Sequence, residues 1–144
     1  MRHGSDALQF LQRLLHLTHA IQVRSRRMMH KLGVTSPQRV AVRIIGQVPG
    51  ISPREIATRL GLHPSTLTGV LARLARDGLI DRRPDPSDGR RSQLWLTRSG
   101  RKIDREHRGT VEAAVERALA RADRAMVEHT EQMIRLLIAE LGRA

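Results

Sequence analysis

Residues 62–97 read LHPSTLTGVLARLARDGLIDRRPDPSDGRRSQLWLT, and this stretch decides the fold of the chain. Its first part, about residues 64–77, has the apolar spacing of a short two-faced helix. Its second part, about residues 79–97, alternates apolar and polar side chains around a turn that contains Asp88 and Gly89. The stretch therefore predicts a helix that leads directly into a two-stranded ribbon.

The two faces of the predicted helix 64–77 differ in their chemistry. At 100° per residue, one face is entirely apolar and carries Leu67, Val70, Leu71 and Leu74. The other face has small residues and then arginines, namely Ser65, Thr66, Thr68, Gly69, Ala72, Arg73 and Arg76. Ordinary exposed helical faces are rich in Glu, Lys and Gln, whereas small hydroxyl side chains let a backbone approach base edges and phosphates. This face favours nucleic-acid contact over the alternative of a plain solvated surface.

The predicted hairpin is rich in arginine. Its arms carry Arg82, Arg83, Arg90 and Arg91. These four cations repel one another unless an anion lies nearby, and a narrow DNA minor groove has the negative potential that attracts inserted arginine. We expect Asp88 to pair with one of them and fix its direction, while Gly89 serves the turn. A hairpin that is merely solvated is the alternative interpretation.

Proline and glycine signals divide the rest of this region into short elements. Ser52 and Glu55 form an expected capping box that opens a helix at Pro53, which ends near Leu60. Two short helices with a glycine-containing turn between them are typical of a helix-turn-helix. For the ribbon we expect strands at about 79–83 and 92–96, since the prolines between them cannot donate to a ladder. Leu79 is expected to fold back on Leu74 where the second helix stops.

Helices are also expected on both sides of this region. The first should run from near Ser5 to about Leu32, which is long for a chain of 144 residues and indicates burial against another subunit. A second should open at Ser36, as N-cap, with Pro37 in its first turn. Two helical stretches should follow Thr97. The fold class is therefore mainly α with a small β-hairpin: a winged helix-turn-helix with long N- and C-terminal dimerisation helices.

The charge balance indicates a polyanionic partner. The formal net charge is +12, and no acidic residue lies between Asp6 and Glu55. Only Lys31 and Lys102 are lysines, so a GC-rich genome could account for arginine over lysine, although it does not explain the surplus over acids. Charge alone does not separate DNA, RNA and an anionic membrane.

Several classes of function find no support. No run of about 18 apolar residues could span a membrane, and there is no cysteine for a disulfide or a thiolate site. Nothing assembles a nucleophile, a base and an orienting acid, so we expect no enzyme and no cofactor. His16 and His19 lie one turn apart, but no further ligand completes a metal set, and we expect none. His30, His107 and His129 have no evident partners. A soluble cytoplasmic protein associated with nucleoid DNA is the expectation.

The stretch from Ser36 to Gly100 resembles the multiple-antibiotic-resistance regulator (MarR) family of bacterial transcription factors. The matching segments are Ser52–Leu60, Pro64-Ser65-Thr66-Leu67-Thr68, Asp77-Gly78-Leu79-Ile80, Asp85-Pro86-Ser87-Asp88-Gly89-Arg90-Arg91-Ser92 and Leu96-Thr97-Arg98-Ser99-Gly100. The last two segments are the most specific. His63 departs from the family pattern, which usually has a better helix-capping residue at that position, so a weaker cap or a phosphate contact is expected there.

The resemblance implies a homodimer whose first and last helices interlock, with no membrane partner. The corresponding domain division is a dimerisation helix at 1–34, a DNA-binding lobe at 35–100 and C-terminal dimerisation helices at 101–144. It places the recognition helix in the major groove of double-stranded DNA and makes Arg90 or Arg91 the minor-groove arginine. We assign backbone contacts to Ser36, Ser52 and Arg54.

The same resemblance implies a repressor of a pseudo-palindromic operator that a small anionic or aromatic ligand releases. A basic protein that binds the nucleoid or RNA without sequence preference is the alternative.

Overall fold

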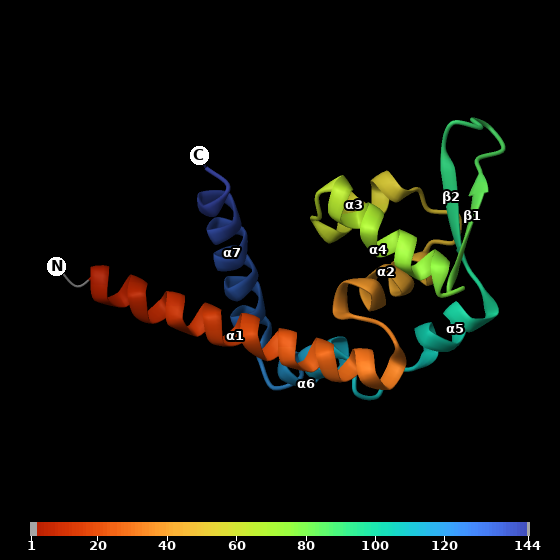
Figure 1. Cartoon of the computed structure of the whole chain (residues 1–144). Helices are drawn as coiled ribbons and strands as arrows, with labels where there is room; N and C mark the ends of the chain where they lie inside the picture. The colour runs from red at the N-terminus through yellow and green to blue at the C-terminus, as the bar shows by residue number, and fades with distance from the viewer. Residues whose placement is uncertain (1–2, 144) are drawn as a thin grey trace.

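The structure, a computed structural model, describes residues 3–143. Figure 1 shows its mainly α-helical architecture with one antiparallel pair of strands, which confirms the expected fold class. The elements in chain order are α1 (His3–Leu32), α2 (Ser36–Gln47), α3 (Pro53–Leu60), α4 (Pro64–Arg76), β1 (Ile80–Pro84), β2 (Ser92–Leu96), α5 (Arg98–Arg105), α6 (Val111–Leu119) and α7 (Arg124–Leu141).

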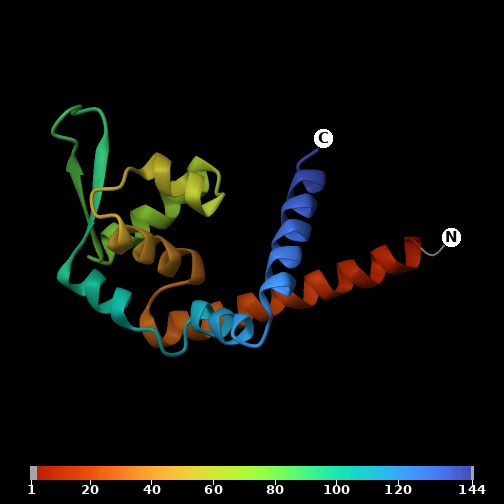
Figure 2. The same ribbon diagram turned by 180° about the vertical axis from the view of Figure 1, so that it is seen from behind.

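Helices α2 to α5 and the hairpin form one lobe, from which α1 and α7 project (Figures 1 and 2). The core of the lobe is aliphatic, and its fully buried members include Ile45, Ile56, Leu71, Leu74 and Leu94. Ile45 comes from α2, Ile56 from α3, Leu71 and Leu74 from α4, and Leu94 from β2. The apolar face predicted for α4 is therefore one wall of this core.

Helix α2 begins differently from the expectation. Thr35, rather than Ser36, is its N-cap, and Thr35 forms a capping box with Gln38 in which the Thr35 N–H donates to Gln38 Oε1 at 2.8 Å. Ser36 is the first helical residue, and its own N–H donates to the hydroxyl of Ser25 on α1 at 2.8 Å. The start of α2 is thus tied to α1. For α3, the Ser52 hydroxyl accepts from the Glu55 N–H at 3.2 Å, but the Glu55 carboxylate pairs with Arg59 at 3.0 Å, so only half of the expected capping box forms.

The stop of α4 is the one that the sequence predicts. The Leu79 N–H donates to the Leu74 carbonyl at 2.9 Å, and the Gly78 N–H donates to the Ala75 carbonyl at 3.0 Å. These are the two bonds of a Schellman motif. Because Leu79 is buried and Ile80 begins β1, this stop determines where the ribbon leaves the helix.

The ribbon extends one residue further than expected along its first arm. Ile80 pairs with Leu96 and Pro84 pairs with Ser92, so Pro84 belongs to β1 rather than to the loop. The Asp85 N–H donates to the Arg91 carbonyl at 2.9 Å, which makes the neighbouring Pro84 position one that donates no ladder bond. Proline is therefore tolerated there.

A single bridge pairs β2 with the segment before α3. Leu94 pairs with Ile51, whose carbonyl accepts from the Leu94 N–H at 3.0 Å. Sequence patterns did not reveal this pairing.

Three helices, rather than the expected two, follow Thr97. The apolar spacing that runs from Ile103 to Leu119 suggests one continuous helix, but Gly109 adopts a φ of +84°, which ends helical geometry. Buried Thr110 then caps α6, and its hydroxyl accepts from the Ala113 N–H at 3.1 Å. Helix α5 consequently stays with the lobe.

An ion-pair network joins α2 to α5 and α6. Arg39 is only 1% exposed; its Nε lies 3.3 Å from Glu112 Oε2, and its Nη1 donates to the Ile103 carbonyl. Arg43 donates to Asp104 Oδ1 at 2.8 Å and to Glu112 Oε1 at 3.1 Å. Burial lowers the pKa of the Arg39 guanidinium, whereas the hydrogen bond with Asp104 raises the pKa of Arg43. These two arginines serve the fold and are not free to bind a polyanion.

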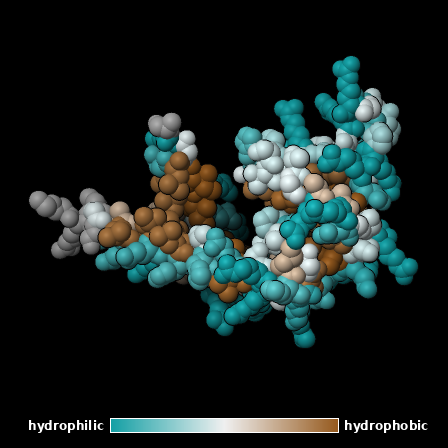
Figure 3. All heavy atoms as spheres, in the orientation of Figure 1, coloured by the Kyte–Doolittle hydropathy of each residue, from teal (hydrophilic) through white to brown (hydrophobic). Residues whose placement is uncertain are grey.

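The terminal helices carry an apolar surface that the lobe lacks. Within residues 3–143, every exposed large apolar side chain belongs to α1, α6 or α7: Leu8, Phe10, Leu11, Leu15, Leu17, Ile21, Val115, Leu119, Met126, Met133, Ile134, Leu136, Ile138 and Leu141. Figure 3 shows part of this surface as brown side chains where α1 and α7 project. Of the stripe expected on the first helix, Met28 is buried and Leu32 is half-buried in the single chain.

Gly100 provides a test of the packing between α5 and the ribbon. The Thr97 hydroxyl accepts from the Gly100 N–H at 3.0 Å and donates to the Gly78 carbonyl at 2.6 Å, so the two segments lie in close contact. A Cβ on Gly100 would overlap the Leu79 carbonyl oxygen. We expect Gly100→Ala to lower the free energy of unfolding by about 1–3 kcal/mol in urea denaturation.

Gly69→Ala is the matched control, because no atom outside its own helix lies near that position. In the exposed interior of α4, this change should raise stability by roughly 0.5–1 kcal/mol. Equal effects of the two substitutions would contradict the close approach at Gly100.

Candidate nucleic-acid interface

The polar face of α4 is exposed to solvent in the chain. All the residues expected on this face are exposed, namely Ser65, Thr66, Thr68, Gly69, Ala72, Arg73 and Arg76. Leu67, Leu71 and Leu74 on the opposite face are buried, and Val70 is half-buried. The two-faced pattern is thus confirmed, and the small residues lie near the N-terminal end of the helix, where the positive end of the helix dipole also lies.

His63 caps this helix. Its backbone is extended, its Nδ1 accepts from the Ser65 N–H at 3.2 Å, and the same nitrogen lies 2.7 Å from Ser65 Oγ. The imidazole therefore fills the place of the usual hydroxyl or carboxamide cap. This arrangement also holds the Ser65 hydroxyl in one position at the start of the exposed face.

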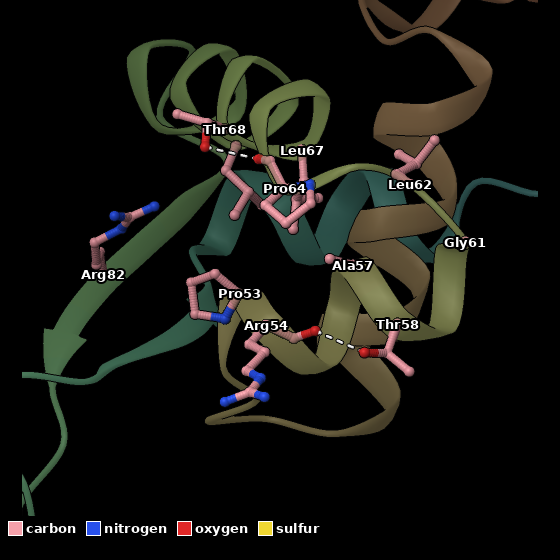
Figure 4. Close-up of a pocket in the computed structure, with 11 residues that line it drawn as sticks. Pro53, Arg54, Ala57, Thr58, Gly61, Leu62, Pro64, Leu67, Thr68 and Arg82 are labelled. Carbon is pink, nitrogen blue, oxygen red and sulfur yellow. Dashed lines mark hydrogen bonds between the residues drawn. The ribbon is translucent and has the colours of Figure 1, made fainter.

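The hydroxyl of Thr68 is occupied within the helix. It donates to the Pro64 carbonyl at 2.9 Å, one turn earlier (Figure 4). Pro64 lies in the first turn of α4, so the bond anchors the threonine rotamer there. With its proton engaged, the hydroxyl can only accept a further hydrogen bond, and the methyl group remains available for apolar contact with a thymine methyl.

All four arginines of the ribbon are exposed, and two of them, Arg91 and Arg83, are braced, which means that a neighbouring side chain contacts the guanidinium. Arg91 Nε lies 3.7 Å from Asp88 Oδ2, and Asp88 Oδ1 accepts from the Arg90 N–H at 3.1 Å. The sequence predicted an aspartate that orients a wing arginine, and Asp88 stands in that relation to Arg91. Arg83 lies over the ring of Trp95, with 5.1 Å from its Cζ to the ring centroid, a contact that the sequence analysis missed.

The turn at the tip of the ribbon is held by its own side chains. Asp85 Oδ1 accepts from the Ser87 N–H at 2.9 Å and from the Ser87 hydroxyl at 2.7 Å. These hydrogen bonds lower the pKa of the Asp85 carboxyl. Asp85 is thereby satisfied within the loop, and the tip presents Arg90 and Gly89 to solvent.

A groove brings residues of α3, α4 and β1 together (Figure 4). It has a volume of about 650 Å³, and its wall includes Arg54, Thr68 and Arg82. Three of the side chains selected from the sequence, each from a different element, therefore share one surface. Ser52 lies at the start of α3, one residue before the groove-lining Pro53.

Ser36 is not part of this group. It lines cavities with residues of α1 and α6 and is bonded to Ser25, so the structure does not bring it together with Arg54 or the ribbon.

His107 has partners that sequence reasoning did not assign. Its Nε2 lies 2.8 Å from Glu116 Oε2, and its Nδ1 lies 3.8 Å from Glu112 Oε1. Glu112 and Glu116 lie one turn apart on α6, and this spacing was the only feature of the sequence that could have indicated partners for His107. One histidine and two glutamates, three residues that could ligate a metal, thus meet, but Glu112 already faces Arg39 and Arg43, whose charges oppose a cation there.

The accessible helix, the braced ribbon and the groove between them define a winged helix-turn-helix protein. The chain belongs to the MarR family, whose pattern matches residues 34–92. No helix within residues 3–143 is both long and apolar enough to cross a bilayer.

Relatives and solved structures agree with this assignment. The HTH-type transcriptional repressor Rv2887 of Mycobacterium tuberculosis is 36% identical over 90 residues, which is 62% of this chain and 65% of the relative. The match thus spans just under two thirds of that protein's length. The PcaV transcriptional regulator of Streptomyces coelicolor, solved with its natural ligand, superposes with a TM-score of 0.72 at 31% identity, covering 90% of this chain and 89% of PcaV.

A DNA complex of Staphylococcus aureus MepR has a TM-score of 0.75 and covers 93% of this chain and 97% of MepR. At 20% identity it supports the fold alone.

The cap of α4 provides a test of the interface. His63→Ala removes the acceptor for the Ser65 N–H, so we expect the free energy of unfolding in urea to fall by about 0.5–2 kcal/mol. His63→Asn restores an acceptor at the N-cap and should return stability to the wild-type value or above it. Equal stability of the alanine and asparagine variants would mean that the imidazole does not act as a cap.

Proposed function

We propose that this protein is a dimeric, sequence-specific DNA-binding transcriptional regulator that represses from a pseudo-palindromic operator. The observation that carries the proposal is the shared exposure of the short hydroxyl face of α4 and the braced arginines of the ribbon on one lobe. The naming of a curated relative as a transcriptional repressor supports the choice of repression.

Each part of the interface has a separate role in this proposal. Ser65, Thr66 and Thr68 read base edges in the major groove, where short side chains permit close approach. Arg73 and Arg76 lie further along the same exposed face and contact backbone or base. Arg90 or Arg91 enters the minor groove, and Arg54 and Ser52 contact phosphate from α3.

Self-association follows from the terminal helices. The exposed apolar side chains of α1, α6 and α7 form more unpartnered surface than a stable monomer would retain, and α7 contains no buried residue in the single chain. We propose that two copies bury these helices against each other. We propose terminal dimerisation helices on either side of a DNA-binding lobe, and we count all of α5 in the lobe because Gly100 and Ile103 contact it.

A cavity between α2 and α6 suits an effector. It has a volume of about 490 Å³, and its wall combines apolar Val40, Ile44, Val111 and Val115 with Arg43, Glu112 and Glu116. Of the small anionic or aromatic ligands proposed to release DNA, this wall favours an aromatic one, because Arg43 is already paired with Glu112 and Asp104. The natural-ligand complex of PcaV gives this proposal a precedent in a protein of similar fold.

Selection of bound duplexes from a random DNA pool tests sequence specificity, symmetry and dimerisation together. For the wild type we expect two inverted half-sites with centres about 10 bp apart, or one helical turn. Thr68→Ala should change the preferred base at one position of each half-site, because it removes the exposed methyl and acceptor of α4. Recovery of unrelated sequences at about 150 mM salt would instead support the nonspecific nucleic-acid-binding alternative.

The ribbon is tested by removing its tip charges. Either Arg90→Ala or Arg91→Ala should weaken operator binding by about 1–3 kcal/mol in fluorescence anisotropy, because one of the two removes the guanidinium that enters the minor groove. Arg135→Ala on α7, an exposed arginine paired with Glu131, is the control and should leave binding unchanged. Circular dichroism should show the same helicity for all three. Operator affinity that survives loss of both tip arginines would rule out the ribbon as a DNA contact.

A further inference from the structure

A second basic site lies outside the winged lobe. A cavity of about 340 Å³ between α1 and the start of α6 is lined by five cationic residues: Arg24, Arg27, Lys31, Arg108 and Arg117. The remaining lining residues are Met28, Leu32 and Gly109, so no carboxylate contributes to the wall.

The cations of this cavity have no anionic partner within residues 3–143. None of the five side chains makes a hydrogen bond or ion pair with that part of the chain, and the buried Nε of Arg24 has no hydrogen-bond partner at all. Arg39 and Arg43 on α2 in contrast form ion pairs with Glu112, and Arg43 also with Asp104, although the buried Nε of Arg39 likewise has no hydrogen-bond partner. The absence of compensation therefore distinguishes this cavity from the neighbouring ion-pair network.

The arrangement is not explained by an ordinary solvated helix face. Arg24, Arg27 and Lys31 recur at helical spacing on α1, and Arg108 and Arg117 face the same space from a different segment. Five like charges around one cavity repel one another even where their side chains are exposed, and a buried donor without an acceptor, here the Arg24 Nε, is costly. An anion that enters the cavity reduces the repulsion between the cations and supplies a hydrogen-bond acceptor.

The chemistry of the wall favours phosphate over a single carboxylate. Arginine presents two parallel N–H donors that match phosphate oxygens, and four of the five cations are arginines. Met28 and Leu32 are the only large apolar lining residues, which leaves little surface for an aromatic ring. An anion with more than one negative charge is needed to balance the wall.

We propose that this cavity is a binding site for a phosphate-bearing anion with several negative charges. It is separate from the DNA interface: α1 and α6 lie on one side of α2 and the tip of the ribbon on the other (Figures 1 and 2). The site also differs from the apolar cavity between α2 and α6 and does not depend on the proposed repression. Occupancy joins α1 to α6, and so stabilises the arrangement of the terminal helices.

The test is titration of the purified full-length protein with inorganic pyrophosphate by calorimetry at low salt, without DNA. We expect saturable binding at least about tenfold tighter than that of orthophosphate, because pyrophosphate carries more charge. Exposed Arg27 and Arg117 can be changed without disturbing the core, and Arg27→Gln with Arg117→Gln should weaken pyrophosphate binding by about tenfold or more.

Two further variants make the result specific. Arg121→Gln removes the same charge from an exposed residue just beyond α6 and should bind pyrophosphate as the wild type does. Arg24→Lys keeps the charge but removes the guanidinium fork, and should weaken binding less than loss of both Arg27 and Arg117. Thermal unfolding with and without pyrophosphate shows that each variant is folded.

A DNA titration separates the two sources of phosphate. If the bound group belongs to a free anion, the double variant binds the selected operator with unchanged affinity and an unchanged salt slope. If it belongs to the DNA backbone, operator affinity falls, the salt slope decreases by about two, and pyrophosphate competes with the operator. The proposal is overturned if the double variant and Arg121→Gln bind pyrophosphate equally, or if the double variant only shifts the monomer–dimer equilibrium in sedimentation, which would assign these cations to carboxylates of a second copy.

Discussion

The buried guanidinium of Arg39 is the constraint on which the arrangement of this chain depends. An arginine that is 1% exposed must be balanced, and Glu112 on α6 and the Ile103 carbonyl on α5 provide the balance. Removal of one partner from such a pair typically destabilises a protein by about 3–5 kcal/mol, since the other charge stays buried. Arg43 extends the pairing to Asp104, so the ion pairs join α2 to both α5 and α6. Since α2 also forms part of the core of the lobe, the position of α4 and the ribbon relative to the terminal helices follows from these contacts.

This network changes the interpretation of the net charge of +12. The run without acidic residues between Asp6 and Glu55 suggested a continuous polyanion-binding surface, but Arg39 and Arg43 within it are engaged internally. Other cations of that run line the cavity beside α6 rather than the exposed face of α4. Under the proposed function, the charge that meets DNA lies on α3, α4 and the ribbon, where arginines share one surface with hydroxyl groups. Total charge therefore predicts the class of partner, and only the fold shows which residues are free to meet it.

Sequence patterns within a few residues predicted most helices and strands, whereas contacts between residues far apart in the sequence could not be predicted from them. The stop at Gly78 and Leu79 was predictable because its two hydrogen bonds join residues a few positions apart. The break at Gly109 was missed because the apolar spacing continues across it, and spacing does not report a positive φ. The partners of Arg39 and Arg43 lie more than 60 residues away in the sequence, and nothing in their own segments indicates which acids they meet. The polar face of α4 was predictable for the opposite reason, since a single helix defines it. Whether each of its side chains touches DNA remains a prediction.

The lobe and the terminal helices differ in how much of their apolar surface the single chain buries. The lobe encloses a core of its own, and its exposed side chains within residues 33–110 include no large apolar group. Helix α7 buries no residue, and the N-terminal part of α1 exposes leucines along its length. A chain of this kind gains most of its remaining apolar burial from a second copy. Under the proposed dimer, the network at Arg39 would then transmit the position of the paired terminal helices to both recognition faces. The spacing of two DNA half-sites would thus be set by contacts within each chain, and any ligand that moves α1 or α6 relative to α2 would alter it.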